Sequence, residues 1–254
     1  MLQIIKQHKF LLEELVKRDF DKKYRGALLG AAWSIMNPLL TFLIMWAIFG
    51  HFFGNFPHYT VYLFCGNVIF SYFSEATSES LVTLVGNAHI FSKVNVPKYL
   101  FLLAKNTQTL INFSLTLLVF FLFCFFDGIT FSWHFIALIY PLAMLLIFNL
   151  GIGFILSALF VFFRDMQYLW GILTQFIMYL SAVFYTIDSF APNVQKLFYL
   201  NPVYLFIRYF RKIVIDGSIP SIEFHVLMAF YAFAVLFLGI WIYKKNDTEF
   251  LYYV

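Results

Sequence analysis

Long apolar stretches separated by short polar connections run through most of this chain. Six of them approach or exceed the roughly 20 helical residues that cross the hydrocarbon core of a bilayer. They cover residues 33–53, 59–84, 100–126, 135–163, 168–187 and 224–243. The pattern predicts an all-α integral membrane protein with six transmembrane helices.

The residues before the first apolar stretch follow a different pattern. Between residues 2 and 24, apolar positions such as Leu11 and Leu15 alternate with charged ones such as Lys9 and Lys17. A helix with one apolar and one charged face lies in the plane of the membrane interface. We expect an N-terminal amphipathic interface helix here, and a solvated charged arm is the alternative interpretation.

Two shorter apolar segments lie between the fifth and sixth stretches, at residues 194–200 and 203–215. They are too short to span a bilayer and too apolar for an exposed loop. Backbone at membrane depth must satisfy its own hydrogen bonds, which favours helix. The pattern predicts two short re-entrant helices.

Composition agrees with a membrane location. Hydrophobic residues make up 62% of the chain and charged residues 12%, with a mean hydropathy of +0.82. A water-soluble fold of this composition would expose large apolar patches. We expect one transmembrane domain over 1–254, with the cytosolic interface helix and membrane approach at 1–32, the six-span bundle at 33–243 and a cytosolic tail at 244–254.

The distribution of basic residues predicts the orientation. Cytosolic connections carry an excess of Lys and Arg. With the N-terminus in the cytosol, thirteen of the 17 basic residues fall on the cytosolic side, and six spans return the C-terminus there beside Lys244 and Lys245. The other four lie between the fifth and sixth spans: Lys196, Arg208, Arg211 and Lys212.

The common sequence signatures of catalysis are absent. The chain holds no G-x-x-x-x-G-K-[ST] phosphate loop, no H-E-x-x-H zinc helix and no G-x-S-x-G nucleophile turn. Cys65 and Cys124 lie in apolar stretches without metal-ligand spacing, which is typical of buried thiols. We therefore expect no catalytic residue, no metal site and no cofactor in this chain.

Two carboxylates interrupt the second apolar stretch. Glu75 and Glu79 are four residues apart and share a helix face. Ionisable groups inside a membrane segment are candidates for function, because exposing them to lipid is costly. We expect them to line a water-filled vestibule or to pair with Arg25 or Lys105, unless the span ends earlier and they belong to a loop.

Aromatic side chains make up 22% of the residues. Aromatic residues beside small or polar neighbours on otherwise apolar spans are candidates for the lining of a channel. Ordinary packing and lipid contact are the alternative explanation for each of them. The candidates are Tyr62, Phe70, Tyr72, Tyr179 and Tyr185.

Four passages, in this order, resemble the transmembrane subunit of polysaccharide-exporting ABC transporters, which move lipid-linked O-antigens, capsules and teichoic acids. The first is a motif where the chain approaches the membrane, with Arg18, Asp19, Arg25, Gly30, Trp33 and Pro38. The second contains Asn87, Ile90, Phe91, Lys93, Val94 and Pro97. The third is the pair Arg164 and Asp165, and the fourth is Asn201, Pro202 and Arg208 with Gly217 behind them.

The resemblance implies the assembly and its partners. Members of that family work as homodimers of six-span subunits bound to two copies of a separate nucleotide-binding ATPase, which holds ATP and Mg. The second passage then corresponds to a cytosolic coupling helix that docks on the ATPase, and Arg164 and Asp165 to a second contact. An amphipathic segment of this kind suits helix-in-groove recognition. An interfacial loop resting on lipid headgroups, with the pair as a headgroup anchor, is the alternative.

The fourth passage corresponds to extracellular gate helices in those relatives. Asn201 and Pro202 begin the segment. Arg208 and Arg211 are expected on the extracellular side, contrary to the excess of basic residues on the cytosolic side. Their charges suit charge-assisted contacts with the pyrophosphate or acidic sugars of a departing substrate. Contact with lipid phosphates is the alternative.

Taken together, the sequence predicts the channel-forming permease of an ATP-driven exporter in the bacterial cytoplasmic membrane. Its expected substrate is an undecaprenyl-linked polysaccharide, of O-antigen type before capsule or teichoic acid, and its other partners are membrane lipids but no nucleic acid. A gradient-driven carrier using Glu75, Glu79 or Asp127 is the first alternative class. An ABC permease for a non-glycan substrate and a membrane enzyme acting on lipid-linked sugars are the others.

Overall fold

The computed structural model describes residues 9–24, 30–52, 58–94, 96–187 and 190–253, and all regular secondary structure in these ranges is helical. The elements along the chain are α2 (Lys9–Tyr24), η1 (Gly30–Ala32), α3 (Trp33–Phe52), α4 (Tyr59–Gly86), α5 (Ala88–Phe91), α6 (Tyr99–Phe126), η2 (Trp133–Leu138), α7 (Ile139–Phe162), α8 (Met166–Leu180), α9 (Pro192–Phe198), α10 (Pro202–Val214), α11 (Ile222–Asn246) and α12 (Phe250–Tyr253). The prediction of an all-α protein is confirmed for this part of the chain.

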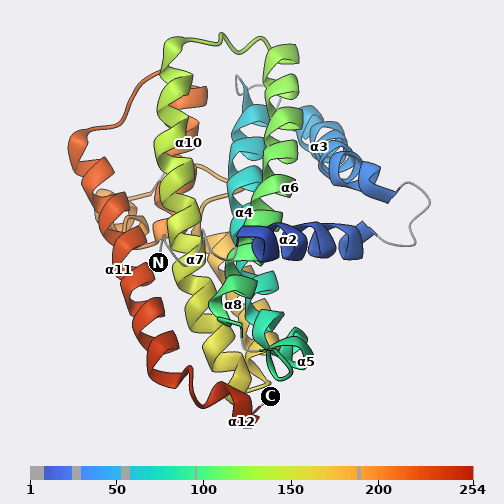
Figure 1. Ribbon diagram of the computed structural model, residues 1–254. Helices are drawn as coiled ribbons and strands as arrows, with labels where there is room; N and C mark the ends of the chain where they lie inside the picture. The colour runs from blue at the N-terminus through green and yellow to red at the C-terminus, as the bar shows by residue number, and fades with distance from the viewer. Residues whose placement is uncertain (1–8, 25–29, 53–57, 95, 188–189, 254) are drawn as a thin grey trace.

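The centre of the bundle is α4, which contacts α6, α7 and α10 (Figure 1). Buried positions follow α4 on every side, from Val61 to Leu84. A helix with apolar residues on most of its faces is expected to be surrounded by others. The main apolar core forms between this helix, α6, α7 and α10.

The closest helix contact joins α7 and α11. A Cβ atom added to Gly239 would lie 2.4 Å from the carbonyl oxygen of Gly151, and one added to Gly151 would lie 2.6 Å from the backbone nitrogen of Leu236. Small residues let helix backbones approach in this way, which is common in membrane bundles. These two glycines hold α11 against the bundle.

Three described helices are long and apolar enough to cross a bilayer: Tyr99–Phe126, Trp133–Phe162 and Ile222–Asn246. A shorter apolar run covers Trp33–Ile48 in α3. Glu75 and Glu79 lie within α4, which has 28 residues, and the fifth predicted span is shorter than expected. α8 ends at Leu180, not at 187, because the chain turns at Ala182, whose φ is 49°.

A helix, α2, forms over Lys9–Tyr24, within the residues for which the pattern predicts an interface helix, and Figure 1 shows it lying across the bundle. Its position in a membrane interface stays a prediction. Leu15 and its apolar neighbours pack on Phe91 of α5 and on Phe101 and Ala104 of α6. Residues 1–8, where the pattern also predicted helix, lie outside the described residues.

The chain then reaches α3 through the predicted approach motif. Gly30 has a φ of +49°, a conformation that favours glycine, and begins η1. Trp33 is the first residue of α3, and Pro38 lies inside that helix, where it cannot donate a backbone hydrogen bond. Arg25, the remaining member of this part of the motif, lies outside the described residues.

Both short segments between the fifth and sixth stretches are helical, as α9 and α10. Pro202 is the first residue of α10, and the Asn201 side chain accepts a hydrogen bond from the Val203 amide at 3.0 Å. Asn is a preferred N-cap, and Pro suits the first helical turn because its missing N–H would be unpaired there. The Asn201–Pro202 pair therefore determines where α10 begins.

Candidate functional site: a charged junction of three helices

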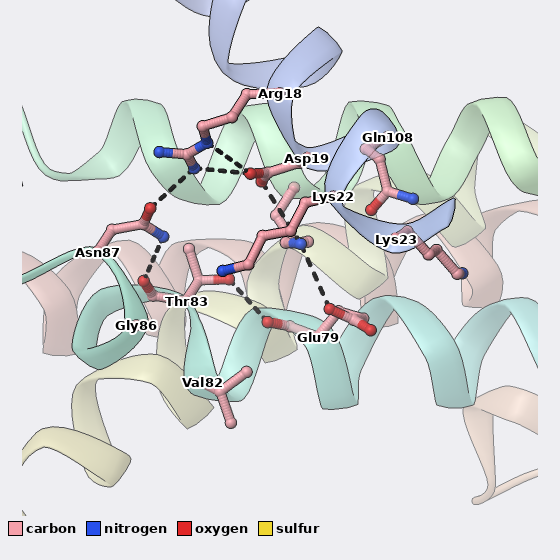
Figure 2. A pocket seen from close by; sticks show the side chains of 11 residues that line it. Arg18, Asp19, Lys22, Lys23, Glu79, Val82, Thr83, Gly86, Asn87 and Gln108 are labelled. Carbon is pink, nitrogen blue, oxygen red and sulfur yellow. Dashed lines mark hydrogen bonds and ion pairs between the residues drawn. The ribbon is translucent and has the colours of Figure 1, made fainter. Parts of the chain in front are cut away.

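A polar cavity of about 300 Å³ lies where α2 meets α4 and α6. Figure 2 shows charged side chains from these elements pointing toward one another across it. Its lining residues are Arg18, Asp19, Lys22, Lys23, Glu79, Val82, Thr83, Gly86, Asn87, Lys105 and Gln108. We refer to this set as the charged junction.

Helical spacing explains why these residues meet. On α4 and just beyond it, positions 79, 82, 83, 86 and 87 recur every three or four residues and share one face. The same rule places 18 beside 22 on α2 and brings 105 near 108 on α6. Each helix thus contributes one polar patch, and the crossing of α2 over the bundle brings the three together.

Arg18 links the interface helix to the start of the predicted coupling segment. Its Nη2 atom donates to the carboxylate of Asp19 at 2.6 Å and to the side-chain oxygen of Asn87 at 2.8 Å. The Asn87 amide nitrogen in turn donates to the Thr83 carbonyl at 2.8 Å. A hydrogen bond therefore joins two residues that were predicted for separate roles: Arg18 at the membrane approach and Asn87 in coupling.

Lys105 occupies the centre of the junction. Its Nζ atom lies 3.4 Å from Asp19 Oδ2 and 3.3 Å from Glu79 Oε2, so one ammonium joins three helices. Asp19 is only 6% exposed. A carboxylate buried to this degree requires charged partners, and Arg18 and Lys105 supply them.

A second ion pair continues the junction along α4. Lys23 Nζ and Glu75 Oε1 are 2.5 Å apart, and Asn112 of α6 donates to the same oxygen at 3.0 Å. The structure thus gives Glu79 the Lys105 partner that the sequence suggested, and Glu75 a partner on the interface helix instead. Their predicted contribution to a channel stays a prediction.

The coupling segment leaves the junction at Asn87. Asn87 and Phe91 are buried, and the Phe91 ring meets that of Phe101 with centroids 6.0 Å apart. The remaining predicted coupling residues are half-buried or exposed: Ile90, Pro97, Lys93 and Val94. One side of the segment is anchored in the protein and the other is accessible.

The C-terminal tail contacts both predicted coupling regions. Lys98 Nζ donates to the Asp247 carbonyl at 2.6 Å and lies 3.2 Å from its carboxylate. Arg164 Nη2 donates to the Tyr253 carbonyl at 3.2 Å, while neighbouring Asp165 is exposed. Figure 1 shows α5, α12 and the C-terminus at one end of the bundle. No pattern in the sequence predicts these contacts of the tail.

The aromatic channel candidates do not form one group. Phe70 and Tyr72 are buried in the core, and Tyr72 stacks on Phe113 with centroids 4.1 Å apart. Tyr62 donates to the Tyr185 carbonyl at 2.8 Å, and Tyr185 donates to that of Tyr179 at 2.7 Å. These three tyrosines connect α4 to the end of α8, and Tyr179 is the exposed member.

The predicted gate residues lie on α10 or at its N-terminal cap. Asn201 donates to the Ser181 hydroxyl at 2.9 Å, in addition to capping the helix. Arg208 donates to the Tyr204 hydroxyl at 3.1 Å, and Arg211 is buried. Pro202 is half-buried. α10 lies toward the end of the bundle opposite α5 (Figure 1).

Sequence reasoning overlooked several residues of the charged junction. Lys22 and Gln108 line the cavity, and Lys23 holds Glu75, although none had been singled out as a site. The available signal was the i, i+4 spacing of 18 and 22 and the polar start of the third apolar stretch. Within the described ranges, no three His, Cys, Asp or Glu side chains are grouped as metal ligands.

Comparison with known proteins gives consistent similarities. The family model described as ABC-2 type transporter matches residues 11–215. The O-antigen export system permease protein RfbA of Klebsiella pneumoniae is 27% identical over 243 residues, which cover 94% of this chain and 93% of the relative. The Myxococcus xanthus protein of the same name is 24% identical over 249 residues, which cover 96% of this chain and 95% of the relative. The polysialic acid transport protein KpsM of Escherichia coli is 24% identical, covering 96% of each.

Proposed function

This chain belongs to the ABC-2 type transporter family, whose model matches residues 11–215, and from this premise we propose that it is the permease subunit of an ATP-driven polysaccharide exporter. The observation that carries the proposal is the similarity over 94% of the chain to an O-antigen export permease. Its proposed substrate is an undecaprenyl-linked glycan of the O-antigen type. Capsular polysaccharide is the second candidate, because a polysialic acid transport protein is 24% identical.

The proposed membrane arrangement has six spans in the bacterial cytoplasmic membrane, with both termini in the cytosol. In it, α3, α4, α6, α7, α8 and α11 cross, and α9 and α10 are re-entrant from the outer side. Three of these six are apolar and long enough on their own. The positive-inside distribution supports this orientation, since the clustered lysines and arginines of α2 and the C-terminal end of α11 fall on the same side.

The functional assembly is proposed to be a homodimer with two copies of a nucleotide-binding ATPase. The exposed apolar side chains of α8 support a second copy, since this helix presents Tyr168, Ile172, Phe176 and Tyr179 on its surface. ATP and Mg belong to the partner subunits. This chain carries no phosphate loop, which is consistent with that division of labour.

The charged junction suggests how the ATPase would act on the permease. Force applied to the coupling segment reaches Asn87, which is hydrogen-bonded to Arg18 of the interface helix. α2 leads through residues 25–29 to α3, the first span. We propose that movement of the coupling segment shifts α2 through this bond and through Lys105, and so repositions the first span relative to the rest of the bundle.

The test is purification of the tagged protein from its native membranes in mild detergent, followed by mass, stoichiometry and ATPase measurements. We expect two copies of this chain with two of an ATPase. Deleting this chain should also remove the glycan from the cell surface while its lipid-linked precursor accumulates inside. An isolated protein whose transport survives ATP depletion but stops with the proton gradient would support the gradient-driven carrier instead.

A further inference from the structure

A second polar pocket lies at the end of the bundle away from the charged junction. It has a volume of about 250 Å³ and is formed by α10, by Tyr62 of α4 and by the chain that follows α8. The lining residues are Tyr62, Thr186, Ile187, Tyr204, Arg208, Arg211, Lys212, Ile215 and Asp216. We call it the α10 pocket.

Three cations of α10 reach this pocket because of helical spacing. Tyr204, Arg208 and Lys212 are four residues apart, and Arg211 and Ile215 lie beside them at i+3 from Arg208 and Lys212, so all five share one broad face. Other sides of α10 are buried in the main core through Phe206 and Phe210. The helix is therefore held firmly while it directs its basic face toward the pocket.

Arg211 is the buried member of this face, at 7% exposed. Its Nε donates to the Tyr62 carbonyl at 3.1 Å, and its Nη1 to the Tyr62 hydroxyl at 2.8 Å and to the Ala182 carbonyl at 2.9 Å. Nη2 donates to the Val183 carbonyl at 2.8 Å. All four acceptors are uncharged, so these bonds fix the guanidinium without neutralising it.

The surroundings contain few negative charges. None of Arg208, Arg211 and Lys212 forms an ion pair with a carboxylate in the part of the chain that the structure describes. Asp216 is the acidic group of the lining, and it is exposed. Three cations against one carboxylate leave a net charge of +2. A buried cation without a counter-charge is costly, and an anionic ligand would lower that cost.

We propose that the α10 pocket binds the phosphoryl groups of a lipid-linked phosphate or diphosphate. Arginine presents a planar fork that matches phosphate oxygens, and charge-assisted bonds of this type are strong. The net charge of +2 matches the two negative charges of a diphosphate diester. The cavity of about 250 Å³ is several times the roughly 30 Å³ that one water occupies, so it has room for such a group.

The site is argued from its own residues, and only the identity of the ligand rests on the proposed export function. If the chain exports an undecaprenyl-linked glycan, the α10 pocket is a place for the carrier's diphosphate near the outer surface. An anionic phospholipid headgroup offers the same phosphoryl chemistry. The two sources are distinguished by competition.

The first experiment is calorimetric titration of the full chain, in nanodiscs of phosphatidylcholine, with inorganic diphosphate. The test variant is Arg208→Gln with Lys212→Gln, because both side chains are half-exposed and make no core contact comparable to that of Arg211. Lys196→Gln is the matched control: an exposed cation of neighbouring α9 that does not line the pocket. Unchanged melting temperatures verify that all variants are folded.

We expect the wild type and Lys196→Gln to bind diphosphate equally, and the double variant to bind at least tenfold more weakly. One charge-assisted bond corresponds to about that factor. Absence of binding by the folded wild type would overturn the proposal. Equal binding by the double variant would overturn it as well.

The second experiment adds undecaprenyl diphosphate or phosphatidylglycerol to the nanodiscs as a competitor. Displacement by undecaprenyl diphosphate alone assigns the pocket to the carrier of the substrate. Equal displacement by phosphatidylglycerol assigns it to membrane lipid. Diphosphate binding that neither lipid displaces contradicts a site for lipid-linked phosphoryl groups. Surface glycan in cells is measured separately, so failure of the export function is distinguishable from failure of this site.

Discussion

Asp19 shows how one side chain holds the charged junction together. It receives a hydrogen bond from Arg18, and Lys105 approaches its other oxygen at 3.4 Å. Because the carboxylate is almost fully buried, losing a charged partner is costly. The stability of the junction therefore depends on each cation individually.

The residue-scale prediction concerns Lys105→Met, which keeps an unbranched side chain one atom shorter and removes its charge. Asp19 and Glu79 then lose their shared cation, and we expect the protein to be destabilised by about 2 kcal/mol. Thermal unfolding in detergent measures this. The control is Lys17→Met on α2, whose side chain is exposed. An equal effect of the two changes would contradict the role of Lys105.

At the scale of elements, α2 and the coupling segment behave as one unit. They share the apolar cluster around Leu15 and Phe91 and the bond between Arg18 and Asn87. An apolar cluster and a hydrogen bond between the same two elements resist sliding of one element along the other as well as their separation. This is the arrangement that the proposed transmission from a partner ATPase to the first span requires.

A double-mutant cycle with Arg18→Gln and Asn87→Ala tests that connection. Residues in direct contact usually show interaction energies of about 0.5–3 kcal/mol. We expect each single change to lower export per ATP hydrolysed, and the double change to cost less than the sum of the two. The readout is the ratio of exported glycan to phosphate released in proteoliposomes. Fully additive effects would show that the bond transmits nothing.

The close approach of α7 and α11 is also a property of whole elements. Gly239→Ala places a methyl group against the Gly151 carbonyl, at 2.4 Å before any adjustment. Overpacking of a close contact costs about 1–3 kcal/mol, so we expect a lower melting temperature. Gly171→Ala in α8 is the control, because a Cβ there meets nothing within 4 Å. Loss of stability in the control alone would refute the explanation.

At the scale of the whole molecule, the coupling segment and the α10 pocket lie toward opposite ends of the bundle. Figure 1 shows α5 and the C-terminal tail at one end of the bundle, α2 with the charged junction crossing nearer its middle, and α10 toward the other end. This separation is what an export path across a membrane needs, with energy input at one surface and release at the other. It depends on the proposed orientation.

Cysteine labelling tests that orientation. Native Cys65 and Cys124 are both buried free thiols, so they provide a low background. We expect a membrane-impermeant maleimide to label Lys196→Cys in intact spheroplasts. Lys244→Cys should react only after permeabilisation. The reverse labelling pattern would invert the topology and place the α10 pocket in the cytosol.

The pattern of apolar residues by itself determined the helical elements, since their lengths and faces follow from local sequence and from the need to satisfy backbone hydrogen bonds in lipid. The four motif passages, which stand in order along the chain, also led correctly to the family. The end of α8 was misplaced, because the chain turns at Ala182, where the carbonyl accepts a hydrogen bond from Arg211 of a distant helix.

Only the tertiary structure decided which polar residues meet. Glu79 and Lys105 had been considered together, but no periodicity places Arg18 against Asn87, 69 residues away, or Asp247 against Lys98. Such contacts depend on the crossing of helices, and small differences in crossing angle select among many possible partners. The helices were thus determined by local physics, whereas the charged junction and the α10 pocket arise from how those helices pack.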